Sequence, residues 1–165
     1  MADHASKRDM HSRSRNLELQ QPDDHLISPC AEALNVQADN IDDAYPMTPF
    51  QSHMAAENLA SRTWVASYAF YCQDATFEYL AEVIEVLQRR HAVLRAHILQ
   101  VDGRFYQAVT RNVSEFETFT STKDYLDDVR GRPMPLGSRA LLLGYGNSES
   151  VTIFILTLGH VVMDE

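Results

Sequence analysis

The chain has 165 residues, 45% of them hydrophobic and 22% charged, and carries a formal net charge of −9 at pH 7. This length suits one domain with a hydrophobic core and is short for two. The acidic balance opposes nonspecific binding to nucleic acid, because a phosphate backbone attracts basic surfaces, and it disfavours anionic membrane surfaces.

Residues 1–40 are polar and show no sustained periodicity, which predicts a flexible leader with at most a short helix at Cys30–Val36. The N-terminus lacks the apolar segment of a secretory signal, and no apolar run is long enough to span a bilayer, so we expect a cytoplasmic protein. Cys30 and Cys72 form no motif with zinc-ligand spacing, and we expect no metal.

Ordered structure is expected from residue 41 onward. Thr48 is suited to cap a helix over Pro49–Leu59, because a proline at the first helical position lacks only an N–H that has no partner there. The aromatic, β-rich run Trp64–Cys72 predicts a strand. Within that strand Cys72 is expected to be a small buried residue rather than a nucleophile.

An amphipathic helix is the strongest local signal. Residues recurring at spacings of three and four lie on one helical face, and here they are Phe77, Leu80, Ile84, Leu87 and His91. Asp74 or Thr76 is suited to cap this helix. Glu85 and Arg89 are spaced for an ion pair on its outer face.

A hairpin is predicted next. The pair Asp102-Gly103 separates Leu94–Val101 from Arg104–Thr110, and such a pair is typical of a tight turn in which both central residues have positive φ.

The remaining chain predicts one helix and two strands. The helix is expected over Thr122–Arg130 and the strands over Arg139–Tyr145 and Val151–Leu158, joined by a polar turn at 146–150. The unbroken apolar character of the last strand indicates a central strand covered on both faces. Because hairpins dominate, the predicted class is α+β with a mixed or mostly antiparallel sheet packed with helices.

Two chemically capable residues follow directly on the last strand. His160 can exchange protons near neutral pH, and Asp164 can orient it or hold the loop through an arginine. A loop at the end of a rigid sheet often carries chemistry. The spacing HxxxD occurs often by chance, so on its own a structural histidine is the more frequent explanation.

Arg95 stands at the junction of a predicted helix and a predicted strand. On its own, a surface arginine is the ordinary interpretation. An arginine that enters a core strand needs a carboxylate partner, however, because an unpaired buried charge is very costly. Asp164 is the only acid placed beside a predicted central strand, which predicts an Arg95–Asp164 ion pair.

Four segments in order resemble the N-terminal part of a nonribosomal peptide synthetase condensation domain in its fungal form. They are Tyr45–Gln51 (YPMTPFQ), Arg90–Arg95 (RHAVLR), Arg132–Gly137 (RPMPLG) and Gly159–Glu165 (GHVVMDE). Thr48 and Gln51 match the opening motif, and the last segment resembles the HHxxxDG signature, at which the chain stops. The resemblance spans residues 41–165, so we expect a partial domain there, the N-terminal lobe only, after a leader at 1–40.

The resemblance implies a chloramphenicol-acetyltransferase-like fold whose two lobes enclose a tunnel. In that family, carrier proteins deliver an acyl or peptidyl thioester and an aminoacyl acceptor on phosphopantetheine arms, and an amide forms. His160 matches the catalytic histidine, Asp164 the structural aspartate and Arg95 its partner. No metal or redox cofactor bound directly to the chain is implied.

Three departures accompany the resemblance. Gly159 replaces the first histidine of the signature, Glu165 replaces its glycine, and the C-terminal lobe is missing. Half a tunnel cannot hold amine and thioester in register, so we expect little or no condensation by this chain alone. Two alternatives stay open: a noncatalytic remnant that binds carrier proteins, and a piece of a CoA-dependent HxxxD acyltransferase.

Overall fold

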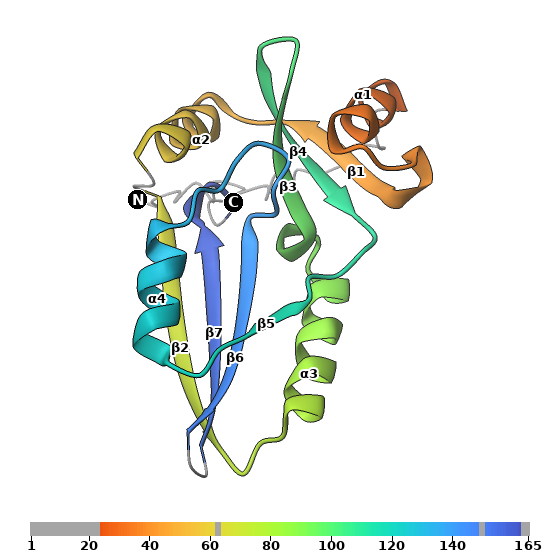
Figure 1. The fold of residues 1–165 in the computed structure, drawn as a ribbon. Helices are drawn as coiled ribbons and strands as arrows, with labels where there is room; N and C mark the ends of the chain where they lie inside the picture. The colour runs from red at the N-terminus through yellow and green to blue at the C-terminus, as the bar shows by residue number, and fades with distance from the viewer. Residues whose placement is uncertain (1–23, 62–63, 149–150, 163–165) are drawn as a thin grey trace, which may run out of the picture.

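The computed structural model of the protein describes residues 24–61, 64–148 and 151–162. Two antiparallel-rich sheets meet end to end, with helices around them (Figure 1). The first sheet has the order β1-β4-β3 and comprises β1 (Ile41–Pro46), β4 (Arg104–Thr110) and β3 (Ala96–Val101). All its pairings are antiparallel.

The second sheet has the order β2-β7-β6-β5. It comprises β2 (Val65–Gln73), β7 (Val151–Gly159), β6 (Leu141–Ser148) and the short β5 (Phe116–Thr118), and only β5 and β6 are parallel. The sheets join where Ala140 donates its N–H to the carbonyl of Ala96, at 3.0 Å. This confirms the predicted α+β class with a mixed, mostly antiparallel sheet.

Helices cover both faces of the second sheet. On one face Ile84 of α3 (Phe77–Arg90) packs with Leu143 and Phe154, and on the other Tyr125 of α4 (Thr122–Gly131) packs with Ile155. Figure 1 shows these helices on opposite sides of the strands. The interior of β7 is buried from both sides, which confirms the predicted central strand.

Several predicted local features are present. Asp102 and Gly103 both have positive φ, at 49° and 78°, so the hairpin of β3 and β4 turns as predicted. Thr76 caps α3 by accepting a hydrogen bond from the N–H of Tyr79. The helix α2 (Pro49–Ser61) begins at Pro49, as predicted.

The expected flexible leader is wrong for residues 24–40. These residues form the helix α1 (Asp24–Leu34) and the short 3-10 helix η1 (Ala38–Asn40). Cys30 and Ala31 of α1 are buried against Leu99 and Ala108 of the first sheet. Leu26, Ile27 and Leu34 pack in the same cluster at helical spacing, but Pro29 lies inside the helix, where a proline normally argues against helical structure. Residues 1–23 lie outside the described part of the chain.

Other boundaries differ from the predictions because pairing overrides local composition. The strand β6 continues to Ser148, which pairs with Val151, so most of the polar turn predicted at 146–150 belongs to the hairpin ladder. The strands β1 and β5 were not predicted. On α3 the buried residues are Ile84 and Gln88, whereas Leu87 is exposed. Cys72, expected to be buried, is half-buried on the edge strand β2.

Candidate active site

His160 begins the short 3-10 helix η3 (His160–Val162) at the end of the central strand β7. Its backbone N–H donates to the carbonyl of Trp64, at 2.8 Å, and the N–H of Gly159 donates to the carbonyl of Ala140, at 2.9 Å. Val161 behind it is buried. The side chain of His160 is half-buried. The backbone under this histidine is therefore fixed on both sides, while its ring remains reachable.

The ring of His160 lies beside the indole of Trp64. The two ring centroids are 6.3 Å apart and the planes meet at 70°, an edge-to-face contact. The indole Nε1–H donates to Oε2 of Glu57 on α2, at 2.6 Å. Trp64 and Glu57 were not predicted as site residues, since their only signal in the sequence is the position of an aromatic residue at the start of a strand.

Thr48 and Gln51 act at the start of α2. The N–H of Thr48 donates to Oε1 of Gln51 at 3.0 Å, and the N–H of Gln51 donates to Oγ1 of Thr48 at 3.2 Å. This reciprocal pair is a capping box, which satisfies two N–H groups that a helix start leaves without partners. Since α2 packs Met54 and Ala55 with Val161 beside His160, these motif residues hold the helix that flanks the candidate site.

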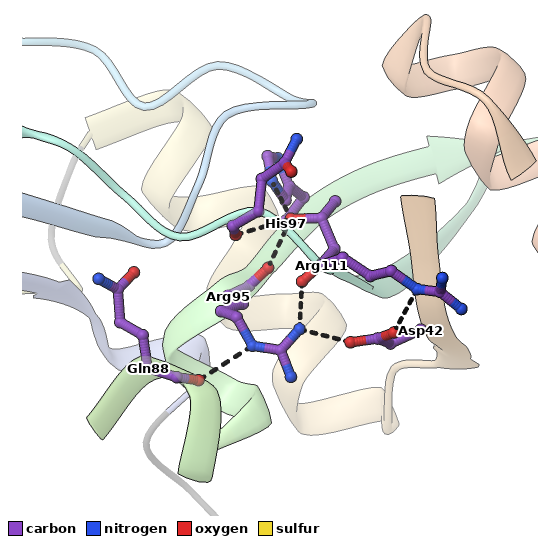
Figure 2. Close-up of polar contacts among 7 residues, drawn as sticks. Asp42, Gln88, Arg95, His97 and Arg111 are labelled. Atoms are coloured by element: carbon purple, nitrogen blue, oxygen red, sulfur yellow. Dashed lines mark hydrogen bonds and ion pairs between the residues drawn. The ribbon is translucent and has the colours of Figure 1, made fainter. Parts of the chain in front are cut away.

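Arg95 ends the 3-10 helix η2 (Ala92–Arg95) and is buried, with 8% of its surface exposed. Its Nε donates to the carbonyl of Gln88 at 2.9 Å, and Nη1 donates to Oδ2 of Asp42 at 2.6 Å and to the carbonyl of Thr110. Arg111 also bonds Asp42, at 2.9 Å. We call these residues the Arg95 cluster. Figure 2 shows Gln88 and Asp42 in contact with the guanidinium of Arg95, and Arg111 in contact with the same Asp42.

The carboxylate of Asp42 is held ionised by these two arginines. Partial burial alone would raise the pKa of Asp42, but the hydrogen bonds and charges of Arg95 and Arg111 outweigh it and lower that pKa. Arg95 therefore has a carboxylate partner that the sequence did not predict, Asp42 on β1. Asp164 and Glu165 lie outside the described residues, so the Arg95–Asp164 pair stays a prediction.

The segment Arg132–Gly137 is tied down at both ends. Arg132 bonds Glu117 on β5 at 2.5 Å and Asp128 on α4 at 2.6 Å. Gly137 has a φ of +83°, which favours glycine, and its N–H donates to the carbonyl of Ile98 at 2.7 Å. The motif thus works as an anchored turn beside β3.

His97 on β3 also holds this turn, through a hydrogen bond to Gly137. Its Nδ1 lies 2.8 Å from the carbonyl of Gly137 and its Nε2 3.4 Å from Oγ1 of Thr110. A carbonyl only accepts, so Nδ1 carries the proton. Burial lowers the pKa of His97, the bond to Gly137 raises it, and the charge of Arg139 lowers it further, so the ring favours the neutral form.

A cavity of about 20 Å³ lies between α2 and the 134–140 segment, with room for about one water. Gly159 lines it, and so does Asn58, whose Oδ1 has no hydrogen-bond partner among the described residues. A Cβ added to Gly159 would meet nothing closer than 3.7 Å. Packing in the described part of the chain therefore does not require glycine where the family motif has histidine.

No three histidine, cysteine, aspartate or glutamate side chains converge as metal ligands within the described residues. None of the helices in residues 24–61, 64–148 and 151–162 is long and apolar enough to cross a membrane.

Several curated fungal proteins are similar to this chain, although no family model matches it. Cyclochlorotine synthetase of Talaromyces islandicus is 30% identical over 138 residues, which is 81% of this chain and 2% of that protein. Nonribosomal peptide synthetase resC of Aspergillus sclerotiorum is 27% identical over 146 residues, 87% of this chain and 11% of that protein. The chain thus spans a small fraction of the length of these relatives.

Solved structures share the fold at low identity. The condensation domain of the monacolin K polyketide synthase MokA superposes with a TM-score of 0.56 at 14% identity, over 73% of this chain and 31% of that one. The starter condensation domain of rhizomide synthetase superposes with a TM-score of 0.62 at 9% identity, over 75% of this chain and 34% of that one. The chain is thus similar in sequence to a part of fungal nonribosomal peptide synthetases and shares the chloramphenicol-acetyltransferase-like fold of these condensation domains.

Proposed function

We propose that this chain supplies the half of a condensation active site that carries the catalytic histidine. In the complete reaction the amine of an aminoacyl group attacks the carbonyl carbon of an acyl or peptidyl thioester. The C–N bond forms, the C–S bond breaks, and the thiol of the donor's phosphopantetheine arm leaves with a proton. Both substrates would be delivered by carrier proteins, in the cytoplasm.

The observation that carries this proposal is the position of His160. Its backbone N–H is bound to Trp64 at the end of the buried strand β7, and its side chain is half-buried beside α2. An imidazole held in this way can accept the proton that the attacking amine loses, or steady the tetrahedral intermediate through an N–H. Both roles need a ring that is reachable and oriented.

The supporting roles are part of the same proposal. Asp164 would have a structural role: an ion pair with Arg95 would hold the segment that follows His160. In the described residues the guanidinium of Arg95 already has three acceptors, from Asp42, Gln88 and Thr110. If Asp164 also pairs with Arg95, it would share the guanidinium with Asp42.

Condensation by the chain alone is not expected. The strand β2 is at the edge of its sheet, and three of its large apolar side chains are 44–65% exposed: Tyr68, Phe70 and Tyr71. Such a surface fits contact with a further part of a domain, and the chain spans 34% of the rhizomide starter domain. Without a second lobe the amine and thioester cannot be held in register.

The test is a fusion of this chain to the remainder of a condensation domain from a related fungal synthetase. Amide formation between carrier-bound substrates is expected from the fusion and not from the chain alone. We expect His160→Ala to lower the rate at least about 100-fold, in line with the loss of a general base. Glu85→Gln on α3 serves as a matched surface control. Equal rates with and without His160 would refute the catalytic role, and turnover of free CoA thioesters would favour a CoA-dependent acyltransferase.

A further inference from the structure

Trp64 contacts His160 through both its backbone and its side chain. Its carbonyl accepts the N–H of His160 at 2.8 Å, and its indole packs edge to face against the imidazole. Among the described residues, the hydrogen bond to His160 is made by its backbone N–H, and its ring has no hydrogen-bond partner. Within this part of the chain, the indole is thus a packing contact that restricts the rotation of the imidazole.

Glu57 fixes the indole in turn. One oxygen of its carboxylate accepts the Nε1–H of Trp64 at 2.6 Å, and the other lies 3.3 Å from Nε2 of His53, one turn earlier on α2. A hydrogen bond to an ionised carboxylate is shorter and stronger than one between neutral groups. The apolar body of Trp64 also packs on the core of Met54, Ala55 and Val161. The indole is thus held at its polar edge and along its body.

We propose that Glu57 and Trp64 are positioning residues for His160: Glu57 locks the indole, and the indole sets the orientation of the imidazole. This assignment rests on the proposed function for its catalytic consequence, but its physical content is a contact that exists in the chain itself. A catalytic group must be held close to its productive geometry by neighbours whose own side chains are locked. Here an aromatic contact provides that support, and neither ring nitrogen is engaged by the residues that the structure describes.

The inference can be tested by NMR on the whole 165-residue chain. It contains a single tryptophan, so the indole N–H signal is unambiguous, and the His160 ring signals are assigned by their loss in His160→Ala. In the unmodified chain we expect a nuclear Overhauser contact between the two rings. Glu57→Ala should accelerate solvent exchange of the indole N–H by about 10-fold, the equivalent of one hydrogen bond, and should weaken the inter-ring contact and shift the His160 signals.

Glu57→Gln is the conservative variant, because its amide oxygen can still accept the indole N–H. In this variant the slow exchange of the indole N–H and the inter-ring contact should both be retained. Glu85→Gln on α3 is the matched control and should change neither. Backbone amide spectra of β7 report whether each variant keeps the fold. Unchanged His160 signals and an intact inter-ring contact in a folded Glu57→Ala chain would overturn the proposal, as would failure of Glu57→Gln to restore them.

Catalysis separates this inference from the proposed function. In the active fusion we expect Glu57→Ala to lower kcat about 10-fold with little change in KM, since misorientation of a catalytic group affects the chemical step. Glu57→Gln should recover most of the rate. If His160→Ala leaves the fusion active, the proposed function fails while the NMR result still decides whether Glu57 and Trp64 orient the ring. If His160→Ala abolishes activity but Glu57→Ala changes neither kcat nor the His160 signals, the positioning role fails and the catalytic role stands.

Discussion

The Arg95 cluster and the His160 end of β7 are held in opposite ways. The guanidinium of Arg95 is buried and bonds a carboxylate and two carbonyls, drawn from three separate elements. The imidazole of His160 is half-buried, and its contact with the described residues is the edge of an aromatic ring. The first arrangement locks a charge for stability, since an unpaired buried charge is costly. The second fixes a backbone, and within the described residues neither ring nitrogen of His160 has a hydrogen-bond partner.

The largest expected effect comes from breaking the Arg95 cluster. Arg95→Ala removes a buried charge from three acceptors and should lower the free energy of unfolding by about 3 kcal/mol, measured by urea titration. Arg111→Ala removes the exposed partner of the same carboxylate and should cost under about 1 kcal/mol. Equal losses in the two variants would show that burial of Arg95 does not set its contribution.

Acid should act on the same region through His97. Its pKa is lowered in the folded state, so below pH 6.5 the unfolded chain binds the proton first and stability falls as the pH drops toward the folded value. The loss should be smaller than that of Arg95→Ala, because the bond from Nδ1 to Gly137 survives protonation. A series of urea titrations at about one pH unit above and about one and a half units below the ordinary histidine pKa measures it. His97→Gln should flatten this dependence, and an equally steep curve in that variant would assign it to another group.

Loss of the capping box at the start of α2 should have an effect of intermediate size on the free energy of unfolding. Thr48→Ala removes the hydroxyl that accepts the N–H of Gln51 and should cost about 1 kcal/mol of unfolding free energy. Thr48→Ser keeps the acceptor oxygen and should be close to neutral. Circular dichroism thermal melts compare the two, and a serine variant as unstable as the alanine variant would count against capping.

The smallest effect is expected at His160 itself. Its half-buried ring has no hydrogen bond to the described residues, so His160→Ala should change the unfolding free energy by under about 0.5 kcal/mol. Together with a large loss of rate in the fusion, this would separate a catalytic from a structural histidine. A loss above about 2 kcal/mol would instead favour the structural role that a lone HxxxD usually has.

Much of the candidate site could be predicted from the sequence, because its parts are local. Thr48, Pro49 and Gln51 stand within one turn, and their bonds follow from helix-start chemistry. His160 follows an apolar run whose length and composition indicate a buried strand. The ion pair of Glu85 with Arg89, at 2.8 Å, follows from helical spacing alone.

The parts that could not be predicted join residues far apart in the chain. Asp42 reaches Arg95 across 53 positions because β1 pairs with β4, a pairing that no short window of sequence contains. Gln88 on α3 was not among the residues predicted for the buried face, but it is buried and its side chain bonds the N–H and carbonyl of Ser114.

By itself, the sequence determined where the helices α2, α3 and α4 start, where the β3–β4 hairpin turns and which strand is central, since each depends on the geometry of a few neighbouring residues. Only the tertiary structure decided that α1 belongs to the core, that Asp42 neutralises Arg95 and that Trp64 and Glu57 stand beside His160. Those contacts arise because burial of apolar surface brings distant segments together, and the polar groups carried along must then find partners where they land.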